Sequence, residues 1–151
     1  QVLRYTLQSN QSQTRSLSEE MEVADSYMFL LQTRFGQNLL IEKKIDEKYD
    51  NYRLPPLAIQ TLLENAIKHN VISKRHPLTI MIETKSDQTL KISNMIQERN
   101  SPESSSGVGL SNLAKQYMFL AGKEILISRK KEEFLVVIPL LNPPENESNN
   151  S

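Results

Sequence analysis

Two pairs of alternating apolar runs constrain the fold of this chain more than any other feature. The runs LTIMIET and TLKISNM flank the short polar turn KSDQ, and the runs EILIS and FLVVIPLL flank the charged turn RKKEE. Apolar residues at every second position, with a short polar turn between the runs, predict β-hairpins. An earlier run, NLLIEKKID, alternates in a similar way and predicts a further strand.

Two helices are predicted before and between these strands. The segment SEEMEVADSYMFLLQTRFG begins with Ser18 as the expected N-cap, followed by Glu20 and an acidic first turn, and Gly36 is the expected stop. Its apolar residues follow helical spacing: Met21, Ala24, Tyr27, Met28 and Leu31. The segment GLSNLAKQYMFLAG predicts another helix, which Gly122 closes.

The order of these segments indicates the fold class. Helices and strands alternate, but the later strands come in hairpins, which favours a two-layer α+β sandwich over a doubly wound parallel fold. We expect helices on one face of a mixed, largely antiparallel sheet. The 151 residues fit one domain, predicted at residues 17–141 after a linker in residues 1–16 and before a disordered tail in residues 142–151.

The composition excludes several classes of site. The 18 basic residues balance the 18 acidic ones, so no net charge draws the chain to nucleic acid or to an anionic membrane. The absence of Cys removes disulfides, thiolate zinc sites and cysteine nucleophiles. No apolar run approaches the roughly 18 residues that span a bilayer, and the start lacks a signal-peptide pattern. We therefore expect a cytoplasmic chain, and its first residue, Gln1, suggests a fragment or a processed product.

The segment LPPLAIQTLLENAIKHN, residues 54–70, predicts a helix with an unusual polar face. Pro55 and Pro56 are expected in its first turn, where a missing N–H costs nothing. At about 100° per residue, one third of the helical wheel is apolar and predicted to be buried. This face consists of Ile59, Leu62, Leu63, Ala66 and Asn70. The polar face consists of Thr61, Asn65 and Lys68, with His69 at its edge.

Two interpretations of this polar face are possible. An amide oxygen can bind Mg²⁺ while a cation and an imidazole meet phosphate oxygens, so Asn65, Lys68 and His69 suit a polyphosphate. A solvated surface explains the same residues, because helices carry polar outer faces by default.

A glycine motif and a strand-end Asn are two further candidates. IQERNSPESSSGVG predicts a long mobile loop, and in the SSSGVGLSNL that closes it, glycines and the opening N–H groups of the next helix suit an anion. A flexible loop that ends at a glycine hinge is the alternative, because the dinucleotide fingerprint and the Walker sequence are absent.

In KISNMI, the side-chain carbonyl of Asn94 can accept a hydrogen bond from a heterocycle, or the residue can simply start a turn.

In chain order, these pieces resemble one family. LPPLAIQTLLENAIKHN is similar to the N box of sensor histidine kinases of the LytS-like type, KISNM stands at the place of their G1 box, and SSGVGLSNL resembles their G2 box. LRYTL and LSEEMEVADSYMFLLQTRFG are similar to the segment between the dimerisation helices and the ATPase core. The resemblance extends to Leu141, and residues 1–16 then correspond to the end of an upstream dimerisation helix and its linker.

The resemblance implies the Bergerat ATP-binding fold, shared with gyrase, mismatch-repair proteins and heat-shock chaperones, with ATP and Mg²⁺ as ligands. It implies that Asn65 holds Mg²⁺ and that Lys68 and His69 approach phosphates or ribose. The implied phosphate end of an ATP lid consists of Gly107, Val108, Gly109 and Leu110. The family's G1 box carries an adenine-binding Asp followed by glycines. Here Asn94 stands at that place and no Gly follows until Gly107, so weak nucleotide affinity is expected.

For the complete protein, the resemblance implies transfer of the γ-phosphoryl group of ATP to a His on a dimerisation helix, and from there to a response regulator. That His is missing from this chain, because His69 belongs to the N box and His76 to a turn, so we expect ATP binding without autophosphorylation. Glu64 is a candidate to polarise the acceptor imidazole, although it points about 100° away from Asn65. A homodimer, anchored in the membrane through the missing N-terminal region, is also implied.

Two other functions are considered. A serine kinase of the anti-sigma type has the same fold, but the LPPL opening and the RYTL lead-in argue against it. A scaffold domain that has lost nucleotide binding is the second alternative, and the departure at Asn94 makes it credible.

Overall fold

The computed structural model of the chain describes residues 13–98 and 108–145. The helices are α2 (Leu17–Phe35), α3 (Ala58–His69) and α4 (Val108–Ala121), with 3-10 turns η1 (Gly36–Asn38) and η2 (Glu47–Tyr49). The strands are β1 (Arg15–Ser16), β2 (Leu39–Lys44), β3 (Arg53–Leu54), β4 (Leu78–Lys85), β5 (Thr89–Met95), β6 (Leu126–Lys130) and β7 (Glu133–Pro139). Within these residues, no helix has both the length and the apolar character to cross a membrane. Most of the predicted loop, and the ends of both predicted flanking segments, lie outside the described residues.

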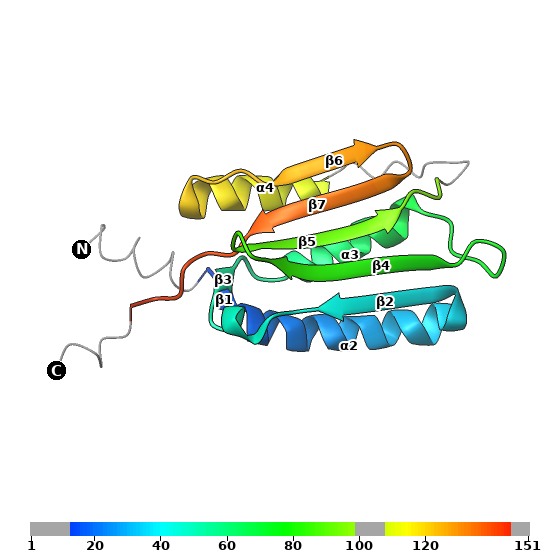
Figure 1. Cartoon of the computed structure of the whole chain (residues 1–151), viewed down its shortest axis with the longest axis horizontal. Helices are drawn as coiled ribbons and strands as arrows, with labels where there is room; N and C mark the ends of the chain where they lie inside the picture. Colours follow the sequence, from blue (N-terminus) through cyan, green and yellow to red (C-terminus); the bar gives the residue numbers. More distant parts are fainter. Residues whose placement is uncertain (1–12, 99–107, 146–151) are drawn as a thin grey trace.

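The main sheet confirms the predicted fold class. In the described part of the chain it has five strands in the order β2-β4-β5-β7-β6, with β2 and β4 parallel and the other neighbours antiparallel. Both predicted hairpins are present, as β4 with β5 and β6 with β7. Ile82 pairs with Ile92 and Ile92 with Val136, so these buried side chains share one face of the sheet. The three helices cover that face (Figure 1).

The start of α2 differs from the prediction. Ser16, not Ser18, is the N-cap, and it forms a reciprocal capping box with Glu19. The Ser16 Oγ accepts from the Glu19 N–H at 3.1 Å, and the Glu19 Oε1 accepts from the Ser16 N–H at 3.4 Å. The predicted stop is confirmed, because Gly36 follows the last helical residue with a φ of 57°, a value that glycine tolerates best.

The start of α3 also differs from the prediction. The helix begins at Ala58, so Pro55 and Pro56 precede it instead of occupying its first turn. Leu57 has a left-handed φ of 64°, which a right-handed helix cannot include. The Ala58 N–H donates to the Pro55 carbonyl at 3.2 Å, so the two prolines form a turn that leads into the helix.

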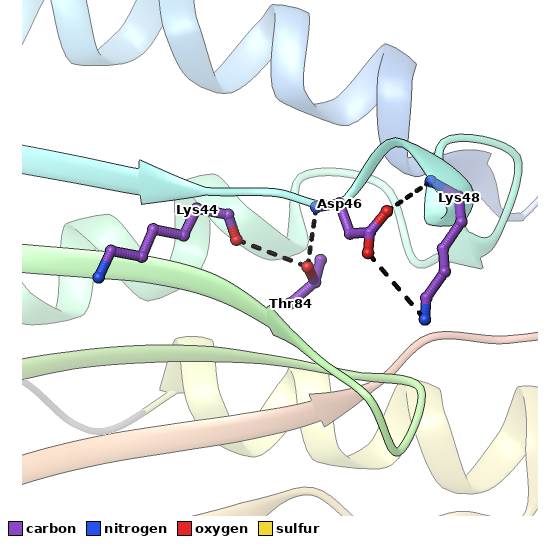
Figure 2. A network of polar contacts seen from close by, with 4 residues as sticks. All are labelled: Lys44, Asp46, Lys48 and Thr84. Carbon is purple, nitrogen blue, oxygen red and sulfur yellow. Dashed lines mark hydrogen bonds and ion pairs between the residues drawn. The ribbon is translucent and has the colours of Figure 1, made fainter.

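The predicted polar loop DEKYDNYR contains ordered structure, namely η2 and the first residue of β3. Tyr49 is buried, and its ring meets the Tyr52 ring edge to face at 5.0 Å between centroids. Figure 2 shows the polar contacts at the entrance to this segment. There, the Thr84 Oγ1 accepts from the Asp46 N–H at 2.9 Å, and the Asp46 Oδ1 accepts from the Lys48 N–H at 3.0 Å. The first bond attaches the segment to the end of β4, and the second lies within the segment.

Candidate functional site

The predicted polar face of α3 is present and accessible. The apolar face is buried as predicted, and its members are Ile59, Leu62, Leu63, Ala66 and Asn70. Thr61 and Asn65 are half-buried on the other side, and Lys68 and His69 are exposed. Among the described residues, no side-chain hydrogen bond engages Asn65, so its carboxamide is available to a ligand.

The first turn of α4 lies against this polar face. A Cβ atom placed on Gly109 would be 3.3 Å from the Thr61 Cγ2, which is closer than most Cβ contacts. Glycine therefore permits this approach of the two helices. Val108 and Gly109 are exposed and Leu110 is half-buried, so the opening N–H groups of α4 lie beside the face that carries Asn65. Gly107 lies outside the described residues.

Asn94 ends an apolar row on the face of the sheet that the helices cover. It pairs with Ile80 on β4, and the residue is 5% exposed. The Asn94 Nδ2 donates to the Met95 carbonyl at 2.8 Å, which leaves the carbonyl oxygen of the carboxamide for a ligand. The residue is within β5 and does not start a turn.

Glu64 occupies a different side of α3 from Asn65. Its Oε1 accepts from the Gln60 Nε2 at 3.1 Å, one turn earlier on the helix. Burial, followed by the negative charge of Glu64, raises the pKa of Tyr27 on α2. Glu64 therefore lies on the side of α3 that is near Tyr27 of α2.

Two buried polar residues make contacts at the two ends of α3 that were not predicted from the sequence. Asn70 accepts from the Gln97 N–H at 2.7 Å, and Glu20 accepts from the Ala58 N–H at 3.2 Å. Burial raises the pKa of the Glu20 carboxyl, whose Oε2 has no hydrogen-bond partner in the part of the chain that the structure describes. A signal for Glu20 was available, because it precedes the buried Ala24 by four residues on the same helix.

The residues present fit a nucleotide-bound Mg²⁺ better than a metal held by protein alone. The described residues contain no group of three or more His, Cys, Asp or Glu side chains that could hold a metal ion. Mg²⁺ bound with a nucleotide needs only one or two protein oxygens, because phosphate oxygens and waters complete its shell. The half-buried carboxamide of Asn65 offers one such oxygen.

Comparisons with known proteins identify relatives of the chain. The family model described as histidine kinase matches residues 1–39. An uncharacterised protein of Bacillus subtilis, YwpD, is 32% identical over 131 residues, which cover 79% of this chain and 47% of that protein. The sensor histidine kinase/phosphatase LytS of Staphylococcus aureus is 29% identical over 136 residues, which cover 80% of this chain and 23% of LytS. The chain thus spans about half of YwpD and about a quarter of LytS.

A solved structure has the same fold as the chain. The catalytic domain of histidine kinase ThkA superposes with a TM-score of 0.57, covering 87% of this chain and 97% of that domain. The sequence identity is 17%, so this comparison shows the fold alone. The chain is thus similar to LytS-like sensor histidine kinases, and it has the fold of a histidine kinase catalytic domain.

Proposed function

We propose that this domain binds Mg²⁺-ATP and presents the γ-phosphoryl group for transfer to a histidine on an upstream dimerisation helix of the complete protein. The observation that carries the proposal is the approach of α4 to the polar face of α3, with Gly109 against Thr61. This approach brings the N-terminus of α4 to the face of α3 that also carries Asn65 and Lys68. An amide oxygen, a cation and a helix N-terminus are groups that bind a metal-bound polyphosphate, which supports the proposal.

Each proposed site residue has a defined role. Asn65 supplies an oxygen to Mg²⁺, and Lys68 and His69 bind phosphate oxygens or ribose. The opening N–H groups of α4, at Val108, Gly109 and Leu110, meet phosphate oxygens at the positive end of the helix dipole, and Gly107 belongs to the same motif. The bound Mg²⁺ neutralises charge on the phosphates. The chain thus contributes positioning and charge stabilisation, which dominate phosphoryl transfer in general.

The other roles concern the adenine, the acceptor and the partners. The carbonyl oxygen of Asn94 accepts from the adenine amino group. Glu64, on the α2 side of α3, orients the acceptor imidazole when the upstream helix docks. In the complete protein, a homodimer anchored through the N-terminal region passes the phosphoryl group to a response regulator, and the described domain works in the cytoplasm.

The neutral side chain at position 94 favours a second candidate, an interaction scaffold that binds no nucleotide. Asn94 lacks the charge that strengthens a hydrogen bond to adenine. The ATP-binding proposal therefore expects weak nucleotide binding, and the scaffold expects none. A serine kinase of the anti-sigma type is a weaker alternative, since the relatives reported above include a sensor histidine kinase.

Titration calorimetry with Mg²⁺-ATP tests the proposal. The Asn65→Ala variant is expected to lose the metal-dependent heat of binding and to keep its circular dichroism spectrum, because Asn65 lies off the buried face. Gln116→Ala is a matched control, since it removes an exposed carboxamide from α4 and should bind like the wild type. Equal affinity of Asn65→Ala and wild type would refute the metal role, and no heat from the wild type at millimolar nucleotide would favour the scaffold.

A further inference from the structure

The end of α3 and the residues after β5 are joined by hydrogen bonds that we call the Asn70–Gln97 clasp. Asn70 is 4% exposed. Its Nδ2 donates to the Ala66 carbonyl at 2.8 Å within α3, and its Oδ1 accepts from the Gln97 N–H at 2.7 Å. The backbone adds a second bond across the same gap, because the Val71 N–H donates to the Gln97 carbonyl at 2.7 Å.

The Gln97 side chain extends the clasp to the loop between α3 and β4. Its Nε2 lies 3.1 Å from the Val71 carbonyl oxygen and 3.3 Å from the carbonyl oxygens of His76 and Pro77. On the other side of this segment, the Ile96 N–H donates to the Glu132 carbonyl at 2.6 Å, in the turn between β6 and β7. The residues that follow β5 are therefore held from both sides.

The clasp connects two of the three elements that carry the proposed nucleotide contacts, namely α3 and β5. Asn65 and Lys68 are on α3, before Asn70, and Asn94 is on β5, before Gln97. Both elements end at the same end of the sheet (Figure 1). Elsewhere, α3 packs on the sheet through apolar side chains, and apolar contact is not directional. Hydrogen bonds with defined angles determine the relative position of the two elements more closely.

We propose that the Asn70–Gln97 clasp is a positioning device that holds the phosphate-binding face of α3 in register with Asn94, so that one nucleotide engages both. This inference rests on the proposed function. A ligand held at two points gains affinity because the first contact raises the effective concentration of the second. Asn70 is a positioning residue, since its carboxamide is committed to Ala66 and Gln97.

The test compares a whole ligand with its two parts. Asn70→Ala and wild type are titrated by NMR with Mg²⁺-ATP, with adenosine and with Mg²⁺-tripolyphosphate. Adenosine reports the Asn94 half of the site, and tripolyphosphate reports the α3 half. We expect Asn70→Ala to lower the affinity for Mg²⁺-ATP by about tenfold, because the two contacts no longer reinforce each other. The affinities for the two partial ligands should change by less than about twofold, because each half is intact.

Two more variants complete the experiment. Gln97→Ala keeps the backbone bond to Asn70 and removes the contacts to the loop after α3, and it should lower Mg²⁺-ATP affinity to a smaller extent. If Asn70→Ala does not fold, the Mg²⁺-ATP affinity of Gln97→Ala tests the clasp in its place. Gln88→Ala is the matched control. Gln88 lies in the turn between β4 and β5, and its Nε2 also donates to a backbone carbonyl, that of Leu140, at 2.6 Å. It should bind all three ligands like the wild type.

Failure of the inference and failure of the proposed function give different results. Unchanged Mg²⁺-ATP affinity in both clasp variants would overturn the inference and leave the proposed function standing. A parallel loss of all three ligands would also overturn it, because the clasp would then support the fold in general. A wild-type protein that binds none of the three ligands would overturn the proposed function, and the inference with it.

Discussion

Asn94 combines burial with an uncharged side chain at the place where the resemblance predicts an aspartate. Its Nδ2 is committed to the Met95 carbonyl, so the carbonyl oxygen of the carboxamide is the acceptor proposed for adenine. A hydrogen bond to a neutral acceptor is weaker than one to a carboxylate. At the scale of single residues, Asn94 therefore limits the nucleotide affinity.

Replacing Asn94 with Asp is expected to raise the Mg²⁺-ATP affinity about fivefold, because a charge-assisted hydrogen bond is roughly twice as strong as a neutral one. The same change removes the donor to Met95, so the free energy of unfolding should fall by about 1–2 kcal/mol. Calorimetry and urea unfolding measure the two effects. Inosine triphosphate is the control ligand, because it lacks the amino group and should show no gain. If the gain is absent for ATP as well, Asn94 does not contact adenine.

The start of α3 depends on a residue from another helix. Leu57 precedes α3 in a left-handed conformation and offers no side-chain cap. Instead, the Glu20 Oε1 of α2 accepts from the Ala58 N–H at 3.2 Å. A carboxylate at a helix N-terminus is favourable, but this one is 2% exposed, and its burial raises the pKa of the carboxyl group. The Glu20 carboxyl thus joins α2 to α3, but burying its charge is unfavourable.

The raised pKa of Glu20 predicts a pH dependence of stability with a defined sign. The folded protein holds the Glu20 proton at a pH where the unfolded chain has released it. The stability from this group is therefore fully present below its unfolded pKa and is lost as the pH rises through its folded pKa. Urea unfolding of wild type and Glu20→Gln from about pH 4 to about pH 8 tests this. Wild type should lose stability relative to the variant as the pH rises, and parallel curves would contradict the prediction.

The predicted starts of α2 and α3 were wrong for different reasons, one local and one tertiary. Ser16 and Ser18 are both acceptable caps, and the partner at the third position, Glu19, selects Ser16. This pattern could have been found in the sequence. The start of α3 could not, because the Glu20 carboxylate that receives the first N–H is 38 residues away in the chain.

At the scale of the whole molecule, nucleotide binding should stabilise the described domain. A ligand that binds only the folded state, present at about 100 times its dissociation constant, adds about 2.7 kcal/mol. For a domain of this size, such a gain raises the melting temperature by roughly 5–10 °C. Differential scanning fluorimetry with Mg²⁺-ATP should show this shift in wild type and none in Asn65→Ala. If ATP without Mg²⁺ raised the melting temperature equally in wild type and Asn65→Ala, that result would contradict the metal-dependent site.

The sequence by itself determined the hairpins, the buried face of α3 and the position of its polar residues, because these follow from periodicities within one segment. Only the tertiary structure decided that Gly109 meets Thr61, that Asn70 holds Gln97 across 27 residues, and that Glu20 caps α3. Such contacts depend on how the helices cross the sheet. The periodicity of each segment specifies which face is buried, and the packing of one segment on another determines which polar groups meet.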